Sequence, residues 1–286
     1  MSLPTISLIT PSYNQAQYLP QTIRSVLNQN YPHLEYFLMD GGSSDNSPQI
    51  IEHYADELTD WVSQKDRGQA DAINQGFARS TGEILGWLNS DDMLWPDALM
   101  AIGSYFAAHP EIDIVMGWSL SFGEEHSSAD SGIRAWYLNE PLGLRLEYLL
   151  YSGYLLPQES VFWRRRVYQQ IGELDLNLYL LDHDYFIRMA LIGAQSAILR
   201  RPIGGFRQHN QQKTDNKAAI QHSQQQIQAN HLEKLGITLT QAQRRRAYWQ
   251  RRVIVERALR KLWRLTIERQ EVAQVLKESE RYLSRL

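Results

Sequence analysis

Short apolar segments rich in β-branched residues alternate with helical segments through the first third of this 286-residue chain. Strands are predicted at residues 5–10, 34–39 and 83–88, with a brief one at 61–62. Helices are predicted at residues 18–27, 48–55 and 68–80. Such spacing is typical of βαβ units, so we expect an α/β fold in which helices flank a Rossmann-like, mostly parallel sheet.

The predicted strands end in polar groups. Residues 11–14 (PSYN) follow the first strand, Asp40 ends the second, and Asp91 and Asp92 follow the strand at 83–88. In parallel sheets ligands collect beyond these carboxyl ends. Two adjacent acids after a buried strand are costly unless a positive charge lies beside them. A Mg²⁺ or Mn²⁺ ion that carries a diphosphate would supply that charge. Alternatively, Ser90 or Asp91 caps a helix that begins near Pro96.

Two other acids have comparable alternatives. Asp40 either accepts hydrogen bonds from a nucleotide or opens an Asx turn into Gly41 and Gly42. Asp182 lies at or just before a helix predicted at 181–192, where it is either a reactive carboxylate or an ordinary N-cap.

Composition limits the function. The chain has no cysteine, which excludes disulfides, thiolate metal sites and cysteine nucleophiles, and this fits a reducing compartment. The first residues lack the basic region of a signal peptide, and no segment approaches the ~20 apolar residues that span a bilayer. We therefore expect a cytoplasmic protein, soluble or peripheral on the inner face of the membrane.

The C-terminal third differs from the rest in charge. Residues 211–238 are predicted to be a polar, glutamine-rich connector, and 239–286 to be basic amphipathic helices with a break near Ile267. Residues 241–269 contain ten basic and two acidic residues, although the whole chain has a net charge of −3. Contact with an anionic membrane, packing on the protein and pairing with a second copy in a homo-oligomer all remain open. Nucleic-acid binding is disfavoured because the remaining body is acidic.

Several short motifs within residues 1–210, in this order, resemble the inverting glycosyltransferases of family 2, which have the GT-A fold. The matching segments are TPSYN (10–14), LMDGGSSD (38–45), GQADAINQG (68–76), STGE (80–83), LNSDD (88–92), PQESVF (157–162), GELD (172–175) and DHDYFIR (182–188). We therefore expect a glycosyltransferase domain over 1–210.

The resemblance implies a nucleotide diphosphate sugar as donor, most simply a UDP-sugar, and a glycan or lipid-linked acceptor. The residues implied in donor binding are Pro11, Ser12, Tyr13, Asp40 and, at the ribose, Asp91. Asp92, with Asp91 and His209, would hold Mn²⁺ or Mg²⁺. Asp182 aligns with the general base, which takes the proton of the acceptor hydroxyl.

The chain departs from the family pattern at three positions. Leu181 stands where many members have an acid before the base, Asn89 where the metal motif often begins with aspartate, and Ile73 where an arginine is common. Asp66, Arg67 or Asp71 is expected to replace the missing contacts to the nucleotide base.

Other classes of function fit less well. A sugar nucleotidyltransferase needs a glycine-rich loop with a basic residue after the first strand, and a dinucleotide oxidoreductase needs G-x-G-x-x-G there; residues 11–15 (PSYNQ) contain neither. The departures at Leu181 and Asn89 leave open a catalytically silent protein that binds sugar nucleotides.

Overall fold

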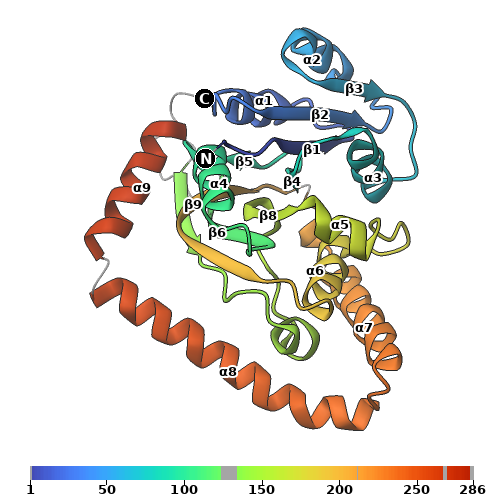
Figure 1. The fold of residues 1–286 in the computed structure, drawn as a ribbon, viewed down its shortest axis with the longest axis vertical. Helices are drawn as coiled ribbons and strands as arrows, with labels where there is room; N and C mark the ends of the chain where they lie inside the picture. Colours follow the sequence, from blue (N-terminus) through green and yellow to red (C-terminus); the bar gives the residue numbers. More distant parts are fainter. Residues whose placement is uncertain (1, 124–133, 211, 267–268, 284–286) are drawn as a thin grey trace.

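The computed structural model describes residues 2–123, 134–210, 212–266 and 269–283, and its described part is built on one nine-stranded sheet (Figure 1). The strand order is β3 (Asp60–Ser63), β2 (Leu34–Asp40), β1 (Ile6–Ser12), β4 (Ile84–Trp87), β8 (Val161–Arg164), β6 (Ile114–Gly123), β9 (Ser196–Gln208) and β5 (Met93–Leu94), with β7 (Arg134–Asn139) paired to β6.

The four strands from β3 to β4 are parallel to one another. Strand β8 then runs antiparallel to both β4 and β6, whereas β6 and β9 are again parallel. The register aligns the ends of neighbouring strands, with Ser12 opposite Asp40 and Asp40 opposite Ser63. The predicted α/β architecture is confirmed, and antiparallel pairings at β8, β5 and β7 are added to it.

Helices cover both faces of the sheet. Apolar side chains of α1 (Leu19–Leu27), α2 (Ser47–His53) and α4 (Ala98–Ala108) form one core against it. The opposite core contains side chains of α3 (Gln69–Arg79), α5 (Arg165–Ile171) and α6 (Leu181–Leu191). All seven residues of β1 are buried, which is consistent with a sequence that has no charged residue.

The segment between β7 and β8 contains two short helical turns. They are a π-helical turn, η2 (Tyr148–Ser152), and a short 3₁₀ turn, η3 (Gln158–Ser160). The side chains of Tyr148, Leu149 and Leu150 are buried in the core that also contains α6.

Three further helices complete the described chain. The predicted glutamine-rich connector contains α7 (Lys217–Lys234), whose Ile227 and Leu232 are buried in the α6 core. Helix α8 (Leu239–Thr266) extends along the outside of the molecule, and α9 (Arg269–Leu283) returns to β5 and β7 (Figure 1). The predicted break near Ile267 lies between α8 and α9, and residues 267–268 are outside the described chain.

Candidate active site

A cavity of about 1100 Å³ opens at the carboxyl ends of the parallel strands. Its wall combines the end of β1, the loop after β4, strand β6, turn η3, the start of α6 and the segment after β9. The predicted site residues that line it are Pro11, Ser12, Tyr13, Asp66, Asp91, Asp92 and Asp182.

Asp91 of this wall contacts His209, which lies outside the set of described residues that line the cavity. Their Oδ2 and Nε2 atoms lie 3.1 Å apart, and the imidazole packs on the Tyr18 ring at 4.4 Å between centroids. Arg207 donates from Nε to the Asp91 carbonyl at 2.7 Å, which fixes the backbone of the acidic loop against β9. The sequence therefore brings together two of its predicted metal ligands over a separation of 118 residues.

The side chain of Asp92 is buried. Its Oδ1 accepts a hydrogen bond from the Arg207 backbone at 3.0 Å, and its Oδ2 accepts one from Asn89 Nδ2 at 3.2 Å. Burial, followed by the charges of Asp91 and Glu159, raises the pKa of Asp92 well above its usual value. Asn89, a departure from the family pattern, thus supplies a donor where an aspartate would add another negative charge.

Glu159 is a buried acid of this cavity that the sequence did not single out. Ser119 Oγ donates to its Oε1. Burial raises the pKa of Glu159 despite this hydrogen bond, and the charges of Asp182 and Asp91 raise it further. Its position depends on Gly204 of β9, because a Cβ there would lie 2.5 Å from Glu159 Cγ.

Asp182 lies in the first turn of α6 and faces the same cavity. Burial raises its pKa, and the positive charge of Lys213 opposes that rise. Lys213 is fixed by a hydrogen bond to Gln69 Oε1 at 3.1 Å and by the Tyr179 ring, 4.6 Å from Nζ. The cavity thus contains a carboxylate suited to accept a proton, beside a cation from the predicted connector.

The first turn of α6 is anchored from behind by α7. His231 Nε2 lies 2.8 Å from Asp184 Oδ1, and Arg188 Nε donates to Asp184 Oδ2 at 2.8 Å. Burial alone would raise the pKa of Asp184, but His231 and Arg188 lower it below its usual value. Ser223 of α7 accepts a hydrogen bond from the Leu180 backbone at 3.1 Å. These contacts restrain the segment that presents Asp182.

Two predicted donor-binding acids are outside the set of described residues that line the cavity. Asp40 accepts hydrogen bonds from the Gly42 and Ser43 backbones and from the Ser43 and Ser63 hydroxyls. Asp71 pairs with Arg67 at 2.6 Å, and this pairing lowers its pKa. The Asx-turn alternative for Asp40 therefore describes its contacts, and both acids shape the loops that border the cavity.

The remaining predicted donor-side residues are accessible or lack a protein partner. The Tyr13 side chain is 62% exposed at the cavity rim. Ser12 Oγ is buried and has no hydrogen-bond partner among the described residues. Burial, followed by the charges of Asp71 and Asp40, raises the pKa of Asp66. Unsatisfied polar groups in a cavity wall are typical of a ligand site.

The donor set fits a divalent cation only in part. No group of three His, Asp or Glu side chains within the described ranges is close enough to enclose a metal. Asp91 and His209 nevertheless converge beside a buried second carboxylate. Mg²⁺-type ions commonly bind through one or two carboxylates and complete their shell with substrate phosphates and water.

Comparison with known proteins identifies the class. Residues 7–172 match glycosyl transferase family 2, and the chain belongs to that family. It is 30% identical over 193 residues to a PGL/p-HBAD biosynthesis glycosyltransferase of Mycobacterium bovis, covering 66% of this chain and 70% of the relative. It is 28% identical over 173 residues to an uncharacterized glycosyltransferase of Nostoc sp., covering 59% of this chain and 54% of that relative.

Solved structures share the fold. S. aureus TarS 1–349 in complex with UDP-GlcNAc matches with a TM-score of 0.56 and 17% identity, over 74% of this chain and 61% of the TarS 1–349 chain. The mannosyltransferase PcManGT from Pyrobaculum calidifontis, in complex with GDP-Man and Mn²⁺, matches with a TM-score of 0.62 and 15% identity, over 97% and 85% of the two chains. These similarities confirm the predicted GT-A type fold.

Proposed function

We propose that the protein is a metal-dependent inverting glycosyltransferase, which moves a sugar from a nucleotide diphosphate donor to an acceptor hydroxyl. One observation carries this proposal: Asp182 and Asp91 line a single cavity, and Asp91 is in contact with His209. The cavity, at about 1100 Å³, has room for a nucleotide sugar.

The nucleoside would lie against residues 11–13 and Asp66. Tyr13 offers an exposed ring for stacking on a base, and Ser12 Oγ offers an unused hydroxyl. We choose a UDP-sugar because TarS was solved with UDP-GlcNAc and with UDP, although PcManGT contains GDP-Man. Asp40 and Asp71 would act indirectly, by shaping the loops around the nucleoside.

Asp91 and His209 would hold Mn²⁺ or Mg²⁺, with Asp92 behind them. A divalent cation there would stabilise negative charge on the departing nucleoside diphosphate. The buried Asp92 would contribute charge to the site and, through Arg207, keep the acidic loop in place.

Asp182 would act as the general base. It takes the proton of the acceptor hydroxyl while that oxygen attacks the anomeric carbon and the bond from this carbon to the diphosphate oxygen breaks. One displacement of this kind inverts the anomeric configuration. A carboxylate with a raised pKa is a stronger base near neutral pH than an ordinary aspartate, which suits this role.

The acceptor would be a glycan or a lipid-linked glycoconjugate of the cell surface. The mycobacterial relatives carry the name PGL/p-HBAD biosynthesis, which supports a role in glycoconjugate synthesis. The alternative of a catalytically silent sugar-nucleotide binding protein is distinguished by turnover.

A thermal-shift screen tests the proposal. The wild-type protein is heated with each of a panel of UDP- and GDP-sugars, with and without Mn²⁺. A bound donor stabilises the folded state by mass action, so we expect one UDP-sugar to raise the melting temperature in the presence of Mn²⁺. Release of nucleoside diphosphate is then measured with that donor. Binding without release in the presence of candidate acceptors would favour the silent alternative, and no shift with any donor would contradict the proposal.

A further inference from the structure

Helix α8 has two faces with opposite surroundings. One face packs on the segment that contains η2, and the other is exposed along most of its length. The sequence left open whether this basic helix packs on the protein or contacts a membrane. The structure shows that its inner residues already have partners within the chain, so the question concerns the outer face alone.

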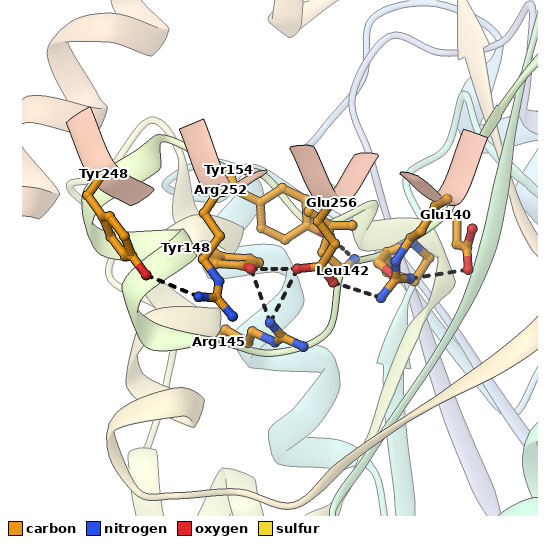
Figure 2. A network of polar contacts seen from close by, with 10 residues as sticks. Glu140, Leu142, Arg145, Tyr148, Tyr154, Tyr248, Arg252 and Glu256 are labelled. Carbon is orange, nitrogen blue, oxygen red and sulfur yellow. Dashed lines mark hydrogen bonds and ion pairs between the residues drawn. The ribbon is translucent and has the colours of Figure 1, made fainter. Parts of the chain in front are cut away.

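The inner face is fastened by a polar network (Figure 2). Glu256 accepts a hydrogen bond from the Tyr148 hydroxyl at 2.5 Å and pairs with Arg145 at 3.3 Å. Arg260 donates to Glu140 Oε1 at 3.1 Å and to the Pro141 carbonyl at 2.8 Å. Apolar contacts accompany this network: Val253 is buried and Trp249 packs on Tyr148 at 5.7 Å between centroids. Helix α8 is therefore held rigidly against η2.

The outer face combines apolar and basic side chains. Tyr248, Ile254, Val255 and Leu259 are 55–66% exposed, an unusual concentration of large apolar residues on one solvent-facing helix. Exposed basic residues lie beside this strip, namely Arg244, Arg251 and Lys261. We call the strip and its flanking basic residues the outer face of α8. No helix in the described part of the chain is both long and apolar enough to span a bilayer.

The segment fastened to α8 also forms part of the cavity wall. It leaves the wall at Asn139, passes through η2 and returns at Leu155, Leu156 and Glu159. The distance between the outer face and the cavity is thus set by a short, packed piece of chain. Anything bound to the outer face would be held in a fixed relation to that wall.

We propose that the outer face of α8 docks on the surface of an anionic phospholipid membrane. The apolar strip would enter the boundary between headgroups and acyl chains, and the flanking basic residues would meet the lipid phosphates. Two copies that paired through this face across a twofold axis would set their arginines against each other. Nucleic acid would satisfy the arginines and leave the apolar strip in water. An anionic lipid surface would neutralise the arginines and also bury the apolar strip.

Docking would bring the cavity to a membrane in which lipid-linked acceptors reside. This consequence rests on the proposed function, whereas the docking does not. Binding to vesicles is measured without any sugar nucleotide, so a failure of docking and a failure of transfer are separately detected.

Vesicle flotation of the full chain tests the inference. The vesicles contain phosphatidylcholine either alone or mixed with phosphatidylglycerol. We expect the wild type to float with the mixed vesicles and to bind the neutral ones at least tenfold more weakly, because basic residues near an anionic surface are attracted to it. V255E/L259E should reduce binding to mixed vesicles by about tenfold or more. The matched control L191E/I192E alters two exposed apolar residues at the end of α6 and should bind as the wild type does.

A second pair of variants tests the charges. R244Q/R251Q should weaken binding to mixed vesicles, whereas K217Q/K234Q, which removes two exposed charges from α7, should not. Circular dichroism confirms that each variant is folded, and light scattering reports its mass in solution. Absence of wild-type binding, or unchanged binding of V255E/L259E, would overturn the proposal. So would a wild-type dimer that V255E/L259E dissociates, since a second copy would then occupy the face.

Discussion

Two sets of carboxylates lie near one another at the edge of this sheet, and their surroundings differ. Asp40 and Asp71 are satisfied within the chain, by four hydrogen bonds and by Arg67 respectively. Asp91, Asp92, Glu159 and Asp182 instead share one cavity. Within this second set, which we call the cavity acids, burial and mutual repulsion raise the pKa values of Asp92 and Glu159, and burial raises that of Asp182.

These surroundings indicate which carboxylates stabilise the fold and which remain available to a ligand. A carboxylate that its own loop satisfies stabilises the fold and has little capacity left for a ligand. Acids grouped in a cavity oppose one another until a cation or a proton arrives, which is costly for stability and useful for binding and proton transfer. The comparison therefore predicts opposite consequences when the two sets are mutated.

The largest expected effect is on turnover. Asp182→Asn removes the base but retains the size and hydrogen-bonding groups of the side chain, so the rate should fall by about 10²–10⁴-fold with donor affinity within a few fold. Release of nucleoside diphosphate and calorimetry measure the two quantities. Unchanged turnover would exclude Asp182 as the base.

The wild-type rate should also depend on pH with a definite sign. The base acts when deprotonated, so the rate should fall as the pH drops through the raised pKa of Asp182. A profile of kcat against pH in the presence of saturating donor measures this. A rate that falls only near pH 4, where an ordinary aspartate becomes protonated, would contradict the raised pKa.

A smaller effect, on the free energy of unfolding, is expected at the contact between α7 and α6. His231→Ala removes a buried hydrogen-bond partner of Asp184 and leaves Arg188 as its ionic contact. Loss of a hydrogen bond to a buried charged group typically costs about 1.5–3 kcal/mol, and we expect a loss in that range. Urea denaturation gives the free energy of unfolding. His222→Ala, on the exposed side of α7, is the matched control and should be neutral; equal stability of both variants would show that the α7 contact does not anchor α6.

Mutations in the two carboxylate sets should change stability in opposite directions. Asp40→Ala leaves the donors from Gly42, Ser43 and Ser63 without their acceptor and should destabilise by about 2–4 kcal/mol. Glu159→Gln removes a buried charge while its side-chain oxygen still accepts from Ser119, and it should stabilise at pH 8 by about 1 kcal/mol.

The pH dependence of the Glu159→Gln effect follows from linkage. Because the folded-state pKa of Glu159 is raised, its favourable contribution is fully present below the unfolded value and is lost as pH rises through the folded value. The advantage of the variant should therefore shrink from pH 8 toward pH 4. Urea denaturation at both pH values measures it, and a pH-independent difference would contradict the buried-charge explanation.

The sequence predicted the fold well because its strands carry strong local signals. The β1 and β2 segments are rich in apolar and aromatic residues, and each is followed by a polar turn segment. The acids at the strand ends placed Asp91 and Asp92 at the edge of the sheet, and the resemblance to the family added Asp182; all three line one cavity. Their individual contacts were beyond prediction, because only the folded chain shows that Asp40 is satisfied by its own loop.

Other parts of the site had no local signal. Glu159 reaches the cavity through the antiparallel insertion of β8, and Lys213 comes from a segment whose polarity predicted only a connector. Helix α7 buries Ser223 and His231 by hydrogen-bonding them to Leu180 and Asp184. A polar composition does not reveal such packing, because the partners lie more than 40 residues away.

Calorimetric titration of the donor found in the screen, with and without Mn²⁺, tests the central claim most directly. We propose Asp91, one of the cavity acids, as a metal ligand, so Mn²⁺ should strengthen donor binding to the wild type and should have little effect on Asp91→Asn. Asp71→Asn, from the satisfied set, should keep the ratio of affinities with and without Mn²⁺ even if both affinities change. The same metal dependence in wild type and Asp91→Asn, or none in the wild type, would contradict the account.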